Sequence, residues 1–158
     1  RTAVMTEVSL TDVAGDCALA FEPVAFEAGK PLEERITADI TVVGDADRLW
    51  RLISILLDNA VKYGAEGGHI TLTLEKTDRQ ARLTVSNPGD PIPPEHLAHL
   101  FERFYKGNKG NFGIGLSITR AAMEYMGGRV QARNRRPPCH GAEFRLMLPV
   151  EEAAGRKG

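Results

Sequence analysis

The sequence predicts an α+β fold in which helices pack on one face of a mixed sheet. Two observations support this prediction. Residues 45–63 place apolar side chains at helical spacing, and several later stretches alternate apolar and polar side chains in pairs that turns separate. Because these hairpins and helices follow one another without an internal repeat, we expect one hydrophobic core between two layers.

The composition is that of a globular domain. The chain has 158 residues, which is enough for one domain with its own core. Its net charge of −1 argues against a nucleic-acid or anionic-membrane surface, and no apolar run reaches the length of a membrane span. Cys17 and Cys139 have no metal-ligand spacing, so we expect two free thiols. The four histidines likewise form no metal constellation.

The chain begins with residues 1–10, which are too short to be a domain and which we interpret as a linker stub from a missing one. Residues 11–28 show apolar side chains near helical spacing, and Gly29 is a suitable residue just beyond a helix. Pro23 inside this pattern predicts a kink. Residues 35–43 are rich in Ile, Thr and Val and predict one or two strands.

The most regular stretch is the helix predicted over residues 45–63. Asp45 and Asp47 stand where an N-cap and a first-turn acid belong. Asn59 interrupts its apolar run, and an amide on a half-buried face needs polar partners. Its oxygen could also ligate a hard cation such as Mg²⁺, although taken alone Asn59 is more often an ordinary surface or capping amide.

Two strands, residues 69–75 and 81–86, follow this helix as a hairpin. The proline-rich run at 87–94 cannot be helix or central strand, and its last prolines could start a short helix through Leu100.

A basic loop then leads to a glycine turn. The loop, residues 106–111, is usually a mere surface feature, but beside a phosphate site it would be a lid with mobile lysines. The turn Gly113–Leu116 opens a helix over 116–126. Its glycines would let phosphates approach free backbone amides, although such a turn alone is weak evidence. We expect a final hairpin from 129–134 and 142–148 with a loop at 135–138. The folded domain would then span residues 11–150, followed by a disordered tail at 151–158.

Four motifs in fixed order carry a resemblance to a known family. The sequence LLDNAVKY (56–63) is followed by NPGDPI (87–92), LFERFY (100–105) and GIGLSI (113–118). Together they resemble the ATP-binding catalytic domain of bacterial sensor histidine kinases, in the GHKL superfamily, over about residues 30–150. The resemblance implies the GHKL or Bergerat fold. This fold is a two-layer α/β sandwich with a mixed, mostly antiparallel sheet, three helices on one face and a nucleotide cleft on the helical side.

The resemblance also implies a site for ATP and Mg²⁺. Asn59 matches an asparagine that coordinates Mg²⁺, and Asn87 matches the position that accepts a hydrogen bond from the adenine amino group. Gly89 matches a glycine that lets the base approach the backbone, and Phe101 belongs with Phe104 to an aromatic box that anchors the lid. The remaining implied ATP-binding residues are Lys62, Tyr63, Ile92, Phe104, Tyr105, Lys106, Gly113, Ile114, Gly115 and Leu116.

The chain departs from the family pattern at several positions. Asn87 stands where an aspartate is usual, so its hydrogen bond to adenine lacks charge assistance, and we expect weaker or less selective binding. Pro91 replaces a later glycine, and the lid at 105–113 is short. Ile55 occupies the position of the glutamate that activates water in hydrolytic relatives, and isoleucine cannot act as a general base.

The implied function is that of the kinase domain of a two-component sensor. It would transfer the γ-phosphate of ATP to a histidine on a separate dimerisation domain, for relay to a response regulator. None of the four histidines lies in a phosphoacceptor context, so we expect a monomeric cytoplasmic piece of a membrane-anchored kinase that does not bind nucleic acid. Two alternatives are an anti-sigma-type serine kinase of the same superfamily and a non-catalytic docking module. An attached histidine-bearing helix would exclude the first, and a lack of Mg²⁺-dependent ATP binding would favour the second.

Overall fold

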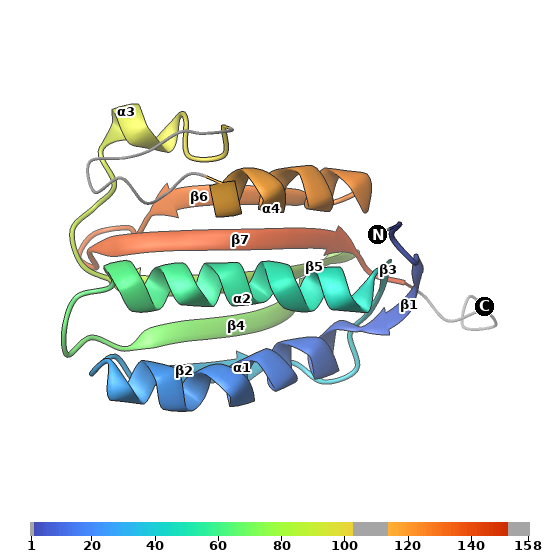
Figure 1. The fold of residues 1–158 in the computed structure, drawn as a ribbon, viewed down its shortest axis with the longest axis horizontal. Coiled ribbons are helices and arrows are strands. Elements are labelled where there is room, and N and C mark those ends of the chain that lie inside the picture. The colour runs from blue at the N-terminus through green and yellow to red at the C-terminus, as the bar shows by residue number, and fades with distance from the viewer. Residues whose placement is uncertain (1, 103–113, 152–158) are drawn as a thin grey trace.

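The computed structural model describes residues 2–102 and 114–151. It contains a five-stranded sheet, a small two-stranded sheet and helices (Figure 1). The elements in chain order are β1 (Thr6–Ser9), α1 (Leu10–Glu27), β2 (Leu32–Ile36), β3 (Thr41–Gly44), α2 (Ala46–Tyr63), β4 (Ile70–Thr77), β5 (Gln80–Pro88), α3 (Pro94–Leu97), α4 (Ile114–Tyr125), β6 (Arg129–Asn134) and β7 (Gly141–Pro149).

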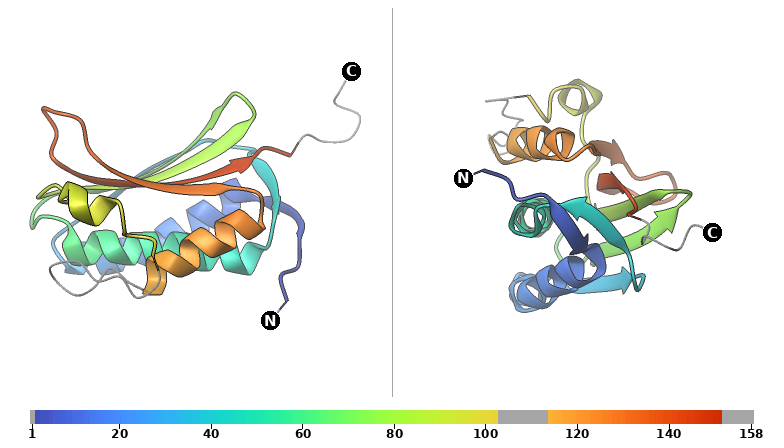
Figure 2. Two further views of the ribbon diagram at one scale, coloured as in Figure 1. Left: turned by 90° about the horizontal axis from the view of Figure 1, so that it is seen from above. Right: turned by 90° about the vertical axis from the view of Figure 1, so that its right-hand side faces the viewer.

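The main sheet has the strand order β2-β4-β5-β7-β6. Strand β2 runs parallel to β4, and the other neighbouring pairs are antiparallel. Helices α1, α2 and α4 cover one face of this sheet, and the other face is open (Figure 2). The predicted α+β sandwich with three helices on one face of a mixed sheet is therefore confirmed.

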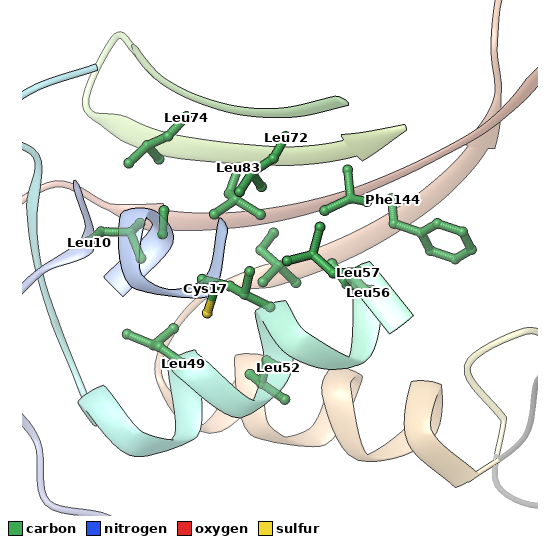
Figure 3. Packing of buried hydrophobic residues seen from close by; sticks show 14 of the residues in the cluster. Leu10, Cys17, Leu49, Leu52, Leu56, Leu57, Leu72, Leu74, Leu83 and Phe144 are labelled. Carbon is green, nitrogen blue, oxygen red and sulfur yellow. The ribbon is translucent and has the colours of Figure 1, made fainter. Parts of the chain in front are cut away.

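Helix α2 is the centre of the helical layer. It begins as predicted, with Asp45 as N-cap, whose Oδ1 accepts a hydrogen bond from the Arg48 amide at 3.1 Å. Its apolar stripe includes Leu56 and Leu57, which pack against leucines of β4 and β5 (Figure 3). Each fully buried leucine stabilises the fold by about 2 kcal/mol, so this face fixes α2 on the sheet.

Helix α1 begins at a cap that the sequence analysis did not identify. The Ser9 hydroxyl accepts a hydrogen bond from the Asp12 amide at 3.1 Å. The helix continues through Pro23 as one element to Glu27, and the kink expected at that proline stays a prediction. Strand β1 directly precedes α1 and pairs with β3, so residues 6–9 belong to the folded unit although they were interpreted as part of a linker stub. The origin of residues 1–10 in a larger protein stays a prediction.

One expectation about the chain after residue 86 is wrong. Asn87 and Pro88 were excluded from a central strand, yet both belong to β5, the middle strand, and pair with Ala142 and Gly141 of β7. The reason is positional. The pairing of β5 with β4 ends at Ser86, so Pro88 lies where only one neighbouring strand remains and its missing N–H disrupts no ladder on the other side. The helix expected from the prolines to Leu100 is confined to Pro94–Leu97.

Both cysteines are free thiols, as predicted, with Cys17 buried and Cys139 exposed. Within residues 2–102 and 114–151, no cluster of three or more His, Cys, Asp or Glu side chains is placed to hold a metal ion. None of the helices in the described part of the chain combines the length and the apolar character needed to cross a membrane.

Candidate functional site

A pocket of about 450 Å³ opens where the C-terminal end of α2 meets the end of β5 and the start of β7. It lies at the end of the sandwich where α3 is drawn in Figure 1. This volume falls in the range of small-molecule sites, which is about 300–1,000 Å³. The lining residues are Asn59, Tyr63, Gly64, Ala65, Asn87, Gly89, Asp90, Pro91, Ile92, Pro93, His96, Ala142 and Phe144.

Helix α2 supplies the amide that the sequence analysis singled out. Asn59 is half-buried and lines the pocket, together with Tyr63 one turn later. The helix ends at Gly64, where a Cβ would lie 2.7 Å from the Ala60 carbonyl oxygen and 3.2 Å from the Cβ of Asn87. The missing side chain thus lets the helix end pack directly beside Asn87.

Strand β5 brings Asn87 to the pocket as an almost fully buried amide, with 6 % of its surface exposed. Its Nδ2 donates to the Pro88 carbonyl oxygen at 3.1 Å, which leaves the side-chain oxygen to accept a hydrogen bond from a ligand. Gly141 of β7 makes this packing possible. A Cβ on Gly141 would lie only 2.0 Å from the Asn87 carbonyl oxygen, so no other residue fits there without a shift of the backbone.

The segment after β5 turns sharply at Gly89, which has φ = +141° and lines the pocket. Such a backbone conformation favours glycine. Two hydrogen bonds fix the turn: Gly89 N–H donates to the His140 carbonyl at 3.3 Å, and Ala65 N–H donates to the Pro88 carbonyl at 2.9 Å. The predicted close approach of backbone to a ligand at Gly89 is therefore structurally possible.

Ile92 forms an apolar wall of the pocket and is held by a residue that the sequence analysis missed. The Ile92 N–H donates to Asn134 Oδ1 at 2.7 Å, and Asn134 Nδ2 donates to the Ile92 carbonyl at 2.9 Å. Asn134 is the last residue of β6, directly before a loop, and no local pattern distinguishes it from a turn residue.

The inner wall comes from β7, which the sequence analysis predicted only as a strand. Phe144 is 5 % exposed, lines the pocket and meets Phe101 edge to face, with 6.5 Å between ring centroids. Phe101, expected in an aromatic box, therefore contacts the pocket wall. His96 of α3 also lines the pocket, although its spacing in the sequence suggested no function.

Two predicted residues of the described chain lie elsewhere. The Lys62 ammonium pairs with Asp58 at 3.0 Å, and its hydrogen bond to that carboxylate raises the pKa of Lys62. Leu116 of α4 is 1 % exposed and belongs to the hydrophobic core of the domain rather than to the pocket lining. Phe104, Tyr105, Lys106 and Gly113 lie outside the described residues, while Ile114 and Gly115 are placed only as the first residues of α4.

The donor set fits a magnesium ion that arrives with a ligand better than one held by protein alone. Asn59 offers a neutral amide oxygen, and no cluster of three acidic or imidazole side chains accompanies it in the described residues. Mg²⁺ commonly keeps several waters and binds through one or two protein oxygens together with substrate phosphates. The pocket thus fits a ligand in which phosphate groups, rather than protein carboxylates, supply the negative charge that balances Mg²⁺.

A family model described as "Histidine kinase-, DNA gyrase B-, and HSP90-like ATPase" matches residues 44–152, which include α2, β5, α4 and the whole pocket. The chain belongs to this family. The family resemblance that the four motifs carry is therefore confirmed.

Curated relatives of the chain within this family are sensor kinases. It is 34 % identical to the sensor protein DltS of Streptococcus agalactiae over 92 % of this chain and 37 % of DltS. It is 32 % identical to the histidine-protein kinase BaeS of Escherichia coli over 95 % of this chain and 32 % of BaeS. The chain therefore spans about a third of the length of these relatives.

Solved structures of histidine kinases share the fold. The catalytic domain of ThkA superposes with a TM-score of 0.82 at 28 % identity, covering 92 % of this chain and 95 % of that one. Full-length ShkA in complex with AMPPNP gives 0.83 at 27 % identity, covering 97 % of this chain and 32 % of ShkA. ThkA in complex with the response regulator TrrA gives 0.79 at 27 % identity, covering 93 % and 42 %.

Proposed function

We propose that this domain binds ATP with Mg²⁺ and serves as the phosphoryl donor of a two-component sensor kinase. The observation that carries the proposal is the convergence of separate motifs on one pocket. Asn59 of α2 lies 28 positions before Asn87 of β5, yet Asn59, Asn87 and Ile92 line the same cavity of about 450 Å³.

The groups that line the pocket suggest one end for the adenine base and another end for the phosphates. Ile92, Gly89 and the buried Asn87 form a compact, mostly apolar wall with one hydrogen-bond acceptor, which suits the edge of an adenine ring. Asn59 lies on the α2 side and offers an oxygen to Mg²⁺ bound to the phosphates. Magnesium, when bound, would neutralise phosphate charge and orient the γ-phosphoryl group.

Transfer to a protein acceptor is supported over hydrolysis by the residue one turn before Asn59. Ile55 has no group that can take a proton from water, so the domain binds ATP without hydrolysing it efficiently. Phosphoryl transfer itself needs mainly positioning and charge neutralisation, and the acceptor histidine would come from a separate dimerisation domain.

The wider context is part of the same proposal. The relatives are sensor kinases about three times as long as this chain, and ThkA has been solved with a response regulator. We therefore infer a membrane-anchored parent in which this domain faces the cytoplasm. A dimerisation domain would receive the phosphoryl group there, and a response regulator would accept it next.

The test is calorimetric titration of the domain with a non-hydrolysable ATP analogue, with and without Mg²⁺. The same titrations use Asn59→Ala and, as a matched control, Arg51→Ala on the exposed side of the same helix. Binding that requires Mg²⁺, falls at least about tenfold in Asn59→Ala and is unchanged in Arg51→Ala is the expected result. Mg²⁺ alone should show no binding. Failure of the intact domain to bind at millimolar nucleotide would refute the proposal.

A further inference from the structure

The sheet has an open face on the side opposite the helices (Figure 2). This face carries a shallow hollow of about 930 Å³. Four arginines line it: Arg79, Arg82, Arg129 and Arg145. The open face of an antiparallel sheet is ordinarily a mixed, solvated surface. On this face, four arginines line one hollow.

The strand register brings three of these arginines together. Arg82 of β5 and Arg129 of β6 both pair with Met147 of β7, so they flank it in one row across three strands. Arg145 lies two residues before Met147 on the same face, between Thr84 and Gln131. Because neighbouring strands are about 4.8 Å apart, the bases of the three side chains lie within about 10 Å. We call Arg82, Arg129 and Arg145 the arginine surface.

The positive charge of this surface is only partly balanced. The hollow is lined by four arginines and a single acid, Asp78, although the whole chain carries a net charge of −1. At its margin, Glu75 pairs with Arg82 at 3.3 Å and Glu143 lies 3.8 Å from Arg145.

Buried donors remain in the arginine surface. The Nε–H groups of Arg82 and Arg145 are buried, and neither reaches an acceptor among the described residues. Buried donors without acceptors cost free energy. Burial and the neighbouring Arg133 and Arg82 also lower the pKa of Arg145, which indicates crowding of like charges.

We propose that the arginine surface docks an acidic segment of a partner protein, whose carboxylates pair with the three guanidinium groups. The planar fork of arginine binds carboxylates through two parallel hydrogen bonds. The three arginines come from three strands and occupy two rows of the sheet. This spacing matches several carboxylates along a segment, whereas a single phosphate would need convergent arginines.

The location adds a functional consequence. The hollow and the pocket share no lining residue and lie on opposite faces of the sheet. A partner on the arginine surface would therefore leave the pocket open, so docking and ligand binding can occur together. The inference does not depend on what the pocket binds.

The test uses a fluorescent peptide of alternating Glu and Ser residues and its Gln counterpart, titrated with the domain at low and high salt. The double variant Arg82→Gln with Arg145→Gln removes two charges from the arginine surface. A matched control, Arg51→Gln with Arg120→Gln, removes the same charge from the helical side. We expect the wild-type domain to bind the Glu peptide but not the Gln peptide. The affinity for the Glu peptide should fall at least about tenfold in Arg82→Gln with Arg145→Gln and stay unchanged in the control. Salt should weaken this binding.

Several outcomes would overturn the inference. These are no binding of the Glu peptide at millimolar domain, equal losses in the two double variants, or tighter arginine-dependent binding of inorganic phosphate or of an oligonucleotide with equal charge. Circular dichroism checks that each variant is folded. If the double variant does not fold, Arg82→Lys with Arg145→Lys keeps the charge and removes only the fork. It should still weaken peptide binding, and full affinity would contradict paired carboxylate recognition.

Discussion

Asn134 and Ile92, 42 positions apart, form a closed pair of hydrogen bonds in which one side-chain amide satisfies both backbone groups of a pocket residue. The two distances, 2.7 and 2.9 Å, are those of well-formed bonds. The end of β6 thus sets the position of the segment after β5, and a change at Asn134 should reach the pocket without touching a ligand.

Replacing Asn134 by alanine should loosen the wall at Ile92. The loss of two hydrogen bonds of about 1 kcal/mol each predicts nucleotide affinity weaker by roughly 5- to 30-fold and a lower melting temperature. Asn134→Asp keeps the acceptor for the Ile92 N–H but loses the donor, so it should lie between the wild type and Asn134→Ala. Calorimetric titration with the ATP analogue measures this order. Equal affinities in all three proteins would show that Asn134 does not position the wall.

Asn87→Asp should restore charge assistance to the hydrogen bond with adenine. A charged acceptor strengthens such a bond by about 1 kcal/mol, which predicts roughly fivefold tighter ATP binding and better discrimination against GTP. The variant also loses the donation from Nδ2 to the Pro88 carbonyl, so its thermal stability should fall slightly. Competition between ATP and GTP measures selectivity. Wild-type selectivity that already equals that of Asn87→Asp would contradict the hypothesis.

The two thiols should differ sharply in reactivity. Cys17 is fully buried between α1 and α2, and burial raises its pKa to about 11, so almost no thiolate forms at pH 8. Cys139 is exposed. We expect one thiol per chain to react with a thiol reagent in native protein and two after denaturation. Native Cys139→Ser should not react, and rapid labelling of that variant would place Cys17 in a less protected site than the structure does.

The raised pKa of Glu34 should make one contribution to the free energy of unfolding larger at acid pH. Partial desolvation of its carboxyl and a hydrogen bond with Glu22 raise the pKa of Glu34 above its ordinary value of 4.5. The folded state then holds this proton more strongly than the unfolded state. The contribution is therefore present below about pH 4.5 and is lost as the pH rises through the folded-state pKa.

The variant Glu34→Gln should consequently melt at a higher temperature than the wild type at pH 7.5, with a difference that shrinks toward pH 4. Glu27→Gln, an exposed change at the end of α1, serves as the control. A stabilisation by Glu34→Gln that does not depend on pH would exclude titration of the Glu34 carboxyl as its cause.

The sequence predicted what local chemistry determines. Residues 46–63 carry their own cap and apolar stripe, and the hairpin of β4 and β5 carries its alternation, so both were found within a few residues of their ends. The family motifs added Asn59, Asn87, Gly89 and Ile92, which the fold brings to one pocket.

What the sequence did not predict depends on partners distant along the chain. Asn134 gains its role only because β6 ends beside Ile92, and Phe144 reaches the pocket only because β7 lies next to β5. Local rules wrongly excluded Pro88 from a central strand. At Pro88, β5 is paired with β7 but no longer with β4, and this one-sided pairing is decided by the tertiary fold. Such facts have no signal within a window of ten or twenty residues.

The position of β7 has a consequence for synthesis. It is the last strand of the described chain in sequence order, yet it lies between β5 and β6 and pairs with both. A chain emerging from the ribosome therefore holds two exposed strand edges apart until Gly141–Pro149 has appeared. Because Ala142 and Phe144 of β7 line the pocket, the pocket is complete only once β7 has been added between β5 and β6.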